Sequence, residues 1–222
     1  MKEQLQKDFE NTIRNLSLSQ KDIEIKKFSL DNFINKGFPN RREEDWKFSD
    51  LNQIINKNIG ELSFYNDYTS TNKVDTSVFV DGLVHNKIVF INGRIEKIDF
   101  DYEKKDQIEI IDQSEIINKF ENNNSLSDLN SAFTNKSFKI VVKKGYQLSK
   151  PLIIYHTTNS KIWSKNINLR LDFELQEDSS LRLIDLFNDT SEKNFLNIFY
   201  NFDLKENAIL KNYKIDLSLI HI

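Results

Sequence analysis

Three histidines, His85, His156 and His221, are the only imidazole side chains in the 222 residues, and there is no cysteine. A closed zinc site takes four ligands, usually Cys or His, and an iron–sulfur cluster takes thiolates or imidazoles. The histidines are far apart and show no paired spacing such as His-x-x-x-His. The sequence therefore predicts that this chain alone binds no metal or cofactor and carries no thiolate nucleophile. His156 follows an apolar run, residues 152–155, and is expected to end a strand.

Carboxylates are numerous, but spacing marks out no acid and base couple. Asp172 and Glu174 lie on one side of a predicted strand, because alternate residues of a strand share a face. Polysaccharide-cleaving proteins built from coiled strands use such carboxylates with calcium or as acid and base. A charged, solvated outer face explains the pair equally, and we favour it. No P-loop, Gly-x-Gly-x-x-Gly or Gly-x-Ser-x-Gly motif is present, so we assign no catalytic, cofactor-binding or metal residue and expect no enzyme.

Residues 38–48 combine dense charge with large aromatic side chains, in the order Phe-Pro-Asn-Arg-Arg-Glu-Glu-Asp-Trp-Lys-Phe. In a structural role, Trp46 and Phe48 would anchor a loop on the core while the charges cap helix ends. In a binding role, Arg and Trp together are typical of interface hot spots. Residue types do not decide the role of the segment from Arg41 to Trp46, although the structural interpretation is slightly favoured.

Charge and hydropathy exclude two classes of partner. Lys and Arg number 31 and Asp and Glu number 34, for a formal net charge of −3. A nucleic-acid binder needs a basic excess that meets phosphates, so nucleic acid is not expected as a partner. The N-terminal residues form no apolar signal core, and no stretch reaches the ~18 apolar residues of a spanning helix. We expect a cytoplasmic protein that does not contact membranes.

Helices are predicted at the start of the chain. One helix face is marked by apolar residues at spacings of four, four and three: Leu5, Phe9, Ile13 and Leu16. A second run, residues 25–34, ends at Gly37 with Pro39 beyond it. Ser49 is expected to cap a third helix over residues 49–55.

The middle of the chain reads as a loop, a hairpin and two short helices. Residues 63–77 are polar and are predicted as a loop. The strands of residues 87–98 flank Asn92-Gly93, which tolerates positive φ at both turn positions and so predicts a β-hairpin. Residues 114–120 and 126–133 are expected to be helical.

From residue 138 onward, strand-like runs follow one another with only turns between them, at residues 138–142, 152–155, 167–175, 181–187, 195–204 and 209–217. Such a series is typical of a sandwich, a barrel or a β-solenoid. A weak repeat favours the solenoid. Residues 175–182 and 204–211 both read Leu-x-Glu-[Asp/Asn]-small-x-Leu-[Arg/Lys], 29 residues apart, and residues 142–148 are a looser copy.

The repeat predicts one corner that is rebuilt on successive coils. Its shared position holds Gly145, Asp178 or Asn207, the residue types that best tolerate left-handed backbone. The flanking aliphatic residues are expected to point inward and to stack on their equivalents in the neighbouring coils. We therefore predict a mainly β protein with α-helices in two domains: residues 1–134, mostly helical with a hairpin near residues 87–98, and residues 135–222, the start of a coil of parallel strands.

Several segments resemble one protein family. Residues 37–51, Gly-Phe-Pro-Asn-Arg-Arg-Glu-Glu-Asp-Trp-Lys-Phe-Ser-Asp-Leu, resemble the Pro-Thr-Arg-x-x-Glu-Asp-Trp-Lys-Tyr-Thr-x-Leu signature of the SufD family of iron–sulfur cluster assembly proteins. Further similarities follow in the family's order: the hairpin at residues 88–94, the Leu-Asn-x-Ala-Phe helix at 129–133, residues 138–156, residues 194–197 and 206–208, and the terminal His221-Ile222. Lys143 stands where the family usually has proline.

The resemblance implies an N-terminal helical domain followed by a right-handed parallel β-helix, here incomplete. It also implies a non-catalytic scaffold subunit that pairs with SufB and the ATPase SufC. A nascent iron–sulfur cluster would form at the interface with SufB. Family members are roughly twice as long, so the chain resembles their N-terminal half, and weak SufC binding is expected. Two alternatives stay open: a β-solenoid lyase or hydrolase that acts on carbohydrate, and a purely structural solenoid such as an adhesin fragment.

Overall fold

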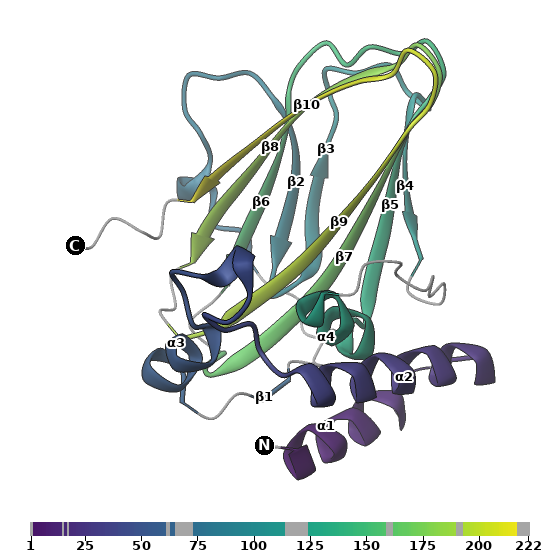
Figure 1. Ribbon diagram of the computed structural model, residues 1–222. Helices are drawn as coiled ribbons and strands as arrows, with labels where there is room; N and C mark the ends of the chain where they lie inside the picture. Colours follow the sequence, from purple (N-terminus) through teal and green to yellow (C-terminus); the bar gives the residue numbers. More distant parts are fainter. Residues whose placement is uncertain are drawn as a thin grey trace.

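The computed structural model describes residues 2–14, 16, 18–60, 63–64, 73–113, 124–158, 162–189 and 193–216. Helices gather at one end of the molecule, and two β-sheets rise from them (Figure 1). The helices are α1 (Lys2–Arg14), α2 (Gln20–Lys36), α3 (Leu51–Asn58) and α4 (Ser125–Phe133), with 3-10 turns at η1 (Glu44–Trp46) and η2 (Thr76–Val78). The fold is mixed α/β, and its first three helices precede most of the strands.

Local sequence explains where the helices begin and end. At the start of α2, Ser19 Oγ accepts a hydrogen bond from the backbone N–H of Asp22, and Gly37, at φ 72°, ends the helix as predicted. The cap of α3 is Asp50, which accepts from the Gln53 N–H at 2.9 Å. The prediction of Ser49 as this cap is wrong, because its N–H instead continues the η1 turn by donating to Trp46 O.

The ten strands form two open, mixed sheets. The first sheet has the order β1-β7-β5-β4, with β9 on the other edge of β7, and the second has the order β10-β8-β6-β2-β3. The strands are β1 (Ser63–Phe64), β2 (Asn86–Ile91), β3 (Arg94–Asp99), β4 (Ile108–Asp112), β5 (Lys136–Val142), β6 (Leu152–Thr158), β7 (Lys165–Leu175), β8 (Ser180–Asp189), β9 (Phe195–Leu204) and β10 (Ile209–Asp216). The predicted runs from residue 138 onward are therefore confirmed as strands. β4 was not predicted, and the loop predicted at residues 63–77 is wrong at its ends, where β1 and the start of η2 lie.

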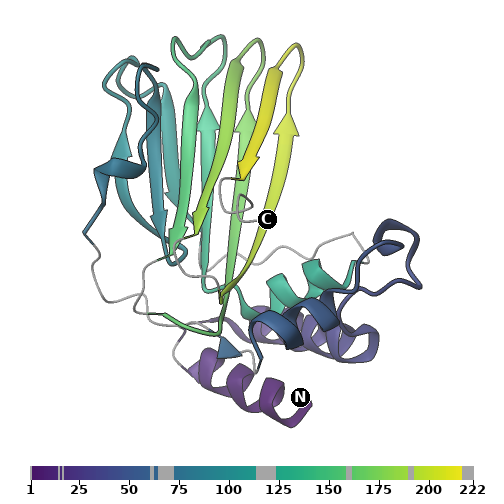
Figure 2. The same cartoon turned by 90° about the vertical axis from the view of Figure 1, so that its left-hand side faces the viewer.

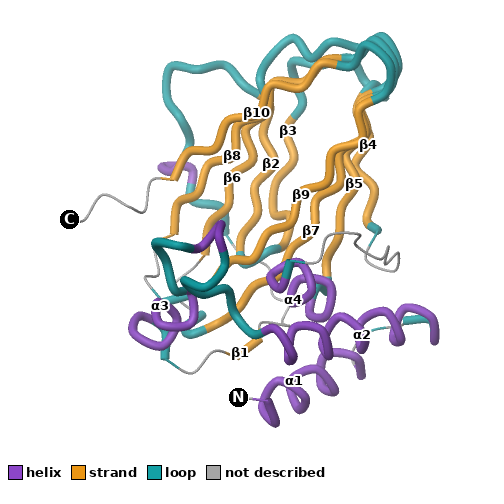
Figure 3. Tube along the Cα trace, viewed as in Figure 1, coloured by secondary structure: helices purple, strands orange, loops and turns teal. Residues whose placement is uncertain are grey.

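From β5 onward the chain alternates between the two sheets, as the orange strands of Figure 3 show. Each strand pairs in parallel with the strand two places earlier: β7 with β5, β8 with β6, β9 with β7 and β10 with β8. The antiparallel pairs are β2 with β3 and β4 with β5. Paired residues such as Leu175 with Leu204 and Leu181 with Leu210 are those that the 29-residue repeat predicts.

The repeated corner is confirmed at the bends that join the first sheet to the second. Gly145, Asp178 and Asn207 have φ of 71°, 58° and 56°, so all three occupy the left-handed region. Neighbouring corners are hydrogen-bonded to one another: Gly145 N–H donates to Glu177 O at 2.8 Å, and Asp178 N–H donates to Glu206 O at 3.0 Å. Asn207 Nδ2 also donates to Asp178 Oδ1 at 3.0 Å.

The main core lies between the two sheets. The aliphatic residues that flank the corners are buried there, as predicted: Val142, Leu148, Leu175 and Leu181. Rows of inward side chains cross from strand to strand, for example Ile140, Phe173 and Phe202 in the first sheet. A second cluster joins α1, α2 and α4, and a third covers the outer face of the second sheet through Val74, Phe79 and Val80.

The predicted hairpin is confirmed as β2 and β3, and its turn residues Asn92 and Gly93 have φ of 53° and 78°. β2 also pairs in parallel with β6, so the hairpin belongs to the same sheet as β6, β8 and β10. The division into residues 1–134 and 135–222 stays a prediction. The helix predicted at residues 114–120 lies outside the described residues.

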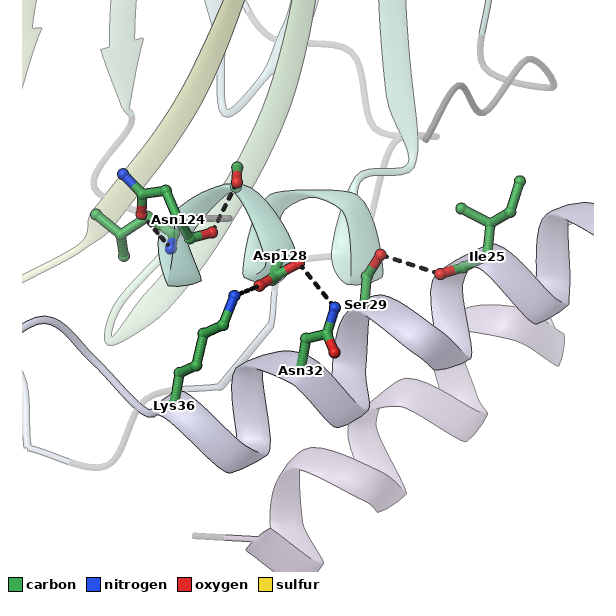
Figure 4. A network of polar contacts seen from close by, with 8 residues as sticks. Ile25, Ser29, Asn32, Lys36, Asn124 and Asp128 are labelled. Atoms are coloured by element: carbon green, nitrogen blue, oxygen red, sulfur yellow. Dashed lines mark hydrogen bonds and ion pairs between the residues drawn. The ribbon is translucent and has the colours of Figure 1, made fainter. Parts of the chain in front are cut away.

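Polar side chains fix α4 to its neighbours. Asp128 accepts from Lys36 Nζ at 2.9 Å and from Asn32 Nδ2 at 3.4 Å, which joins α4 to α2 (Figure 4). On its opposite side, Asn130 Nδ2 donates to Leu169 O of β7 at 3.1 Å and to Asn197 O of β9 at 2.7 Å. The helical layer is thus hydrogen-bonded to two strands of the first sheet.

A buried lysine closes the C-terminal end of α4. Lys26 of α2 is only 1% exposed, and its Nζ donates to Ser131 O, Ala132 O and Thr134 O at 3.2, 3.3 and 2.7 Å. The last carbonyls of a helix have no partner within it, and a cation at that end is favourable. Burial lowers the pKa of Lys26 to about 7, although the Asp22 carboxylate acts in the opposite direction.

Candidate functional site

The candidate functional site is the loop of residues 38–50 between α2 and α3, here named the charged loop. Phe38 fixes its start, because its ring packs edge-on against Phe33 of α2 and Phe195 of β9, with centroids 5.1 and 6.1 Å apart. The Leu51 N–H donates to Pro39 O at 3.1 Å and closes the loop. The charged loop projects from the same side of the molecule as β9 and β10 (Figure 2).

Phe48 does not anchor the loop. Its side chain is 88% exposed, and only Lys47 Nζ lies near it, 5.6 Å from the ring centroid. Trp46 is half-buried. The prediction that Phe48 packs on the core is therefore wrong, because Phe38 already fills the position between α2 and β9.

The charges of the loop point to solvent as well. Five consecutive charged residues, Arg41, Arg42, Glu43, Glu44 and Asp45, are exposed. The geometry therefore removes the anchoring role of Phe48, whereas the binding interpretation of this segment rests on its residue types alone.

His85 and His156 lie on opposite faces of the second sheet. His85 contacts the outer face of the second sheet, where its Nε2 lies 2.8 Å from Tyr155 Oη and its Nδ1 lies 2.6 Å from Leu83 O. His156 lies between the sheets, two residues before the end of β6, so the prediction that it ends the strand is wrong by two residues. His221 lies outside the described residues.

A polar cluster around His156 was not predicted from the sequence. His156 Nε2 lies 2.7 Å from Tyr200 Oη, which donates to Asp185 Oδ1 at 2.5 Å. The imidazole is stacked between the rings of Phe90 and Phe187, with centroids 5.3 and 4.8 Å away. β6, β8 and β9 each supply one member, so three polar groups meet inside an otherwise apolar core. No local motif could have shown this, because the members are 15 to 44 residues apart.

Burial sets the electrostatics of this cluster. Burial lowers the pKa of His156, and the nearby charge of Lys214 acts in the same direction. Asp185 acts in the opposite direction but does not outweigh burial. Burial, followed by the proximity of Asp185, raises the pKa of Tyr200 well above its usual value. At neutral pH the imidazole and the phenol are therefore both uncharged, and each can donate one hydrogen bond.

Asp172 and Glu174 lie on one face of β7, as the sequence predicts. The favoured prediction of a solvated outer face is wrong for Asp172, which is buried, and both carboxylates have cationic partners. Arg170 Nε and Nη2 donate to Asp172 Oδ1 at 3.1 and 3.0 Å, and Glu174 is paired with Lys139. Ion pairing to Lys139 and the Gln176 hydrogen bond lower the pKa of Glu174 against the effect of burial. Two ion-paired carboxylates of this kind are poor candidates for an acid and base couple.

The carboxylate of Glu103 accepts hydrogen bonds from several donors at an irregular bend. Its Oε1 accepts from Asn86 Nδ2 and Lys150 N–H at 2.7 and 3.1 Å, and its Oε2 accepts from Tyr146 Oη and Ser149 N–H at 2.7 and 3.1 Å. Burial opposes ionisation, but these hydrogen bonds outweigh it and lower the pKa of Glu103.

Replacing Glu103 by Gln is expected to lower the free energy of unfolding by about 1 to 3 kcal/mol at pH 7, because the donors around it lose a charged acceptor. The folded-state pKa lies below the unfolded value, so this stabilisation exists above the unfolded pKa and is lost as the pH falls through the folded pKa. Urea unfolding at pH 7 and at pH 3.5 measures both effects. A difference between the two proteins that grows on acidification would contradict this assignment.

Among the described residues, no group of three or more His, Cys, Asp or Glu side chains is placed to hold a metal ion. Within the same ranges, no helix combines the length and the apolar character needed to cross a membrane. Compared with protein-family models and with curated proteins, the chain gives no match.

Proposed function

We propose that the chain is a non-catalytic scaffold subunit of the SUF iron–sulfur cluster assembly complex, which acts in the cytoplasm and pairs with SufB and the ATPase SufC. The proposal starts from the resemblance of residues 37–51 and the segments after them to the SufD family. The observation that supports it most is the parallel pairing of strands that alternate between two sheets. Such pairing is what a right-handed parallel β-helix requires, and we propose that fold for residues 135–222.

Strands β9 and β10 carry large exposed apolar side chains, including Leu204, Ile209 and Tyr213. Apolar side chains that gather on an exposed face favour contact with a protein partner. The charged loop lies on the same side, so one partner surface can contact both features (Figure 2).

An iron–sulfur cluster would be the cargo of such a complex. Thiolates hold most such clusters, and the 222 residues contain no cysteine. Any thiolate ligands at the proposed interface would therefore come from outside these residues, which fits a scaffold that shapes the interface and leaves cluster ligation to SufB.

Co-expression of the tagged chain with SufB and SufC of its source cell tests the proposal. We expect SufB to co-purify with the chain and to elute with it as one species in size-exclusion chromatography. SufC is expected to bind weakly by itself. A chain that is folded by circular dichroism but retains neither protein would overturn the proposal.

A pair of phenylalanine variants locates the contact. Phe48→Ser is expected to weaken SufB retention at least about tenfold without a change in thermal stability, because an exposed aromatic residue is a typical hot spot. Phe28→Ser is the matched control, since Phe28 of α2 is also exposed, at 52%, but lies outside the charged loop. Equal effects of the two substitutions would argue against the loop as the contact.

A further inference from the structure

The polar cluster of His156, Asp185 and Tyr200 brings together three atoms that can bind a metal ion. They are joined by hydrogen bonds, and the three distances between them are 2.7, 2.5 and 3.6 Å. Tetrahedral ligands that each lie about 2.0 to 2.2 Å from one ion are themselves about 3.3 to 3.6 Å apart. An ion that replaces the two shared protons would therefore move Tyr200 Oη away from its two partners by about 1 Å.

We propose that His156 Nε2, Asp185 Oδ1 and Tyr200 Oη bind a divalent first-row transition metal ion. One nitrogen and two oxygen donors suit zinc, copper or iron better than calcium or magnesium, which prefer oxygen alone. Three protein ligands also leave a fourth position open, as in catalytic zinc sites. This site goes beyond the proposed scaffold function and does not depend on it.

Binding would exchange protons for the ion. The single proton of the neutral imidazole moves from Nε2 to Nδ1, and the phenol proton of Tyr200 leaves to solvent as the phenolate bonds to the ion. A bound dication favours the phenolate, because a coordinating group bonds to the ion in its deprotonated form. The aromatic rings of Phe90 and Phe187 hold the imidazole in place for this exchange.

The proposal departs from the expectation that this chain alone holds no metal. That expectation considered only histidine and cysteine ligands at short spacings in the sequence. The proposed ligands include a tyrosine, and they come from three different strands. Lys214 of β10 pairs in register with Asp185, and its Nζ lies 4.6 Å from the Phe187 ring centroid. A cation there opposes a second cation, so Lys214 is expected to weaken binding.

Titration of the full 222-residue chain with Zn²⁺ tests the site by calorimetry, and Co²⁺ provides an absorption spectrum of the bound ion. We expect one equivalent of ion to bind and to raise the melting temperature. Tyr200→Phe and Asp185→Asn keep the shape of the core and should each weaken binding at least about tenfold, the lower end of the loss seen even for outer-shell partners. Lys214→Gln should strengthen binding.

Tyr146→Phe is the matched control. Tyr146 Oη also contacts a carboxylate, Glu103 Oε2, at 2.7 Å, but no imidazole is part of that contact. Its binding isotherm should equal that of the parent chain. Absence of saturable binding in the parent chain, or binding that the three site substitutions leave unchanged, would overturn the proposal even if a core variant fails to fold.

Discussion

Replacing Lys26 by Met should lower the free energy of unfolding by about 2 to 4 kcal/mol at pH 9, because the buried carbonyls at the end of α4 lose the two N–H groups that the neutral Lys26 amine still offers them. Methionine has a similar length and leaves little empty space, so the loss comes mainly from the hydrogen bonds. Chemical denaturation followed by circular dichroism measures this change. A variant as stable as the parent would show that these carbonyls find other partners.

The same substitution should change the pH dependence of stability. The pKa of Lys26 is about 7 in the folded chain, against 10.5 for a free lysine side chain, so the unfolded chain binds more protons between these values. The free energy of unfolding of the parent chain therefore rises from pH 7 towards pH 10. Lys26 contributes up to about 1.4 kcal/mol per pH unit to this rise. Below pH 7 both states carry the charge, and this slope disappears.

The stability difference between the parent and the Lys26→Met variant should accordingly widen between pH 6 and pH 9. Lys27→Met provides the control, because Lys27 is the next residue of α2 and is exposed. Its difference from the parent should not vary with pH over this range. If the stability difference between the parent and the Lys26→Met variant stays constant or narrows towards pH 9, burial does not disfavour the charged form of Lys26.

Replacing Asn130 by Ala should lower the free energy of unfolding by about 2 to 3 kcal/mol. Asn130 is fully buried, donates to two strands and accepts from Thr134 Oγ1 at 2.8 Å. Its loss leaves buried acceptors in β7 and β9 without a partner. Hydrogen exchange should become faster in β9 before it does so in β8, because α4 is hydrogen-bonded to the first sheet.

The control for this prediction is Asn56→Ala. Asn56 is exposed on α3 and makes only a long hydrogen bond of 3.5 Å within its own helix. Its substitution should change stability by no more than about 0.5 kcal/mol. If Asn130→Ala is equally mild, the contact between α4 and the strands depends on apolar packing and not on the amide.

The repeated corner could be predicted because its signal is local. Gly145, Asp178 and Asn207 share a backbone requirement that only a few residue types meet, and the 29-residue offset returns unchanged in the strand register. Hairpin and helix ends were predictable for the same reason. Each depends on a residue such as Gly93 or Gly37 whose conformational freedom is visible in the sequence.

The polar sites could not be predicted, because their partners are distant in sequence. Lys26 meets carbonyls more than 100 residues away, and Asn130 meets β9 67 residues later. A buried lysine reads as a surface residue in any sequence pattern. The prediction for Phe48 was wrong in the opposite sense: an aromatic side chain is expected to be buried, but Phe48 is exposed. Phe38 occupies the apolar position in the fold that was predicted for Phe48.

The bend held by Glu103 is also where one connection between the sheets is longer than the connection beside it. Gln147 and Leu152 are five residues apart, whereas their partners Ser180 and Leu183 are three apart. The longer connection thus accommodates a two-residue insertion, and the carboxylate of Glu103 binds the N–H groups of Ser149 and Lys150 that the extra length frees from the ladder. Insertions in this chain are therefore tolerated where a side chain from another segment can replace the missing strand as acceptor.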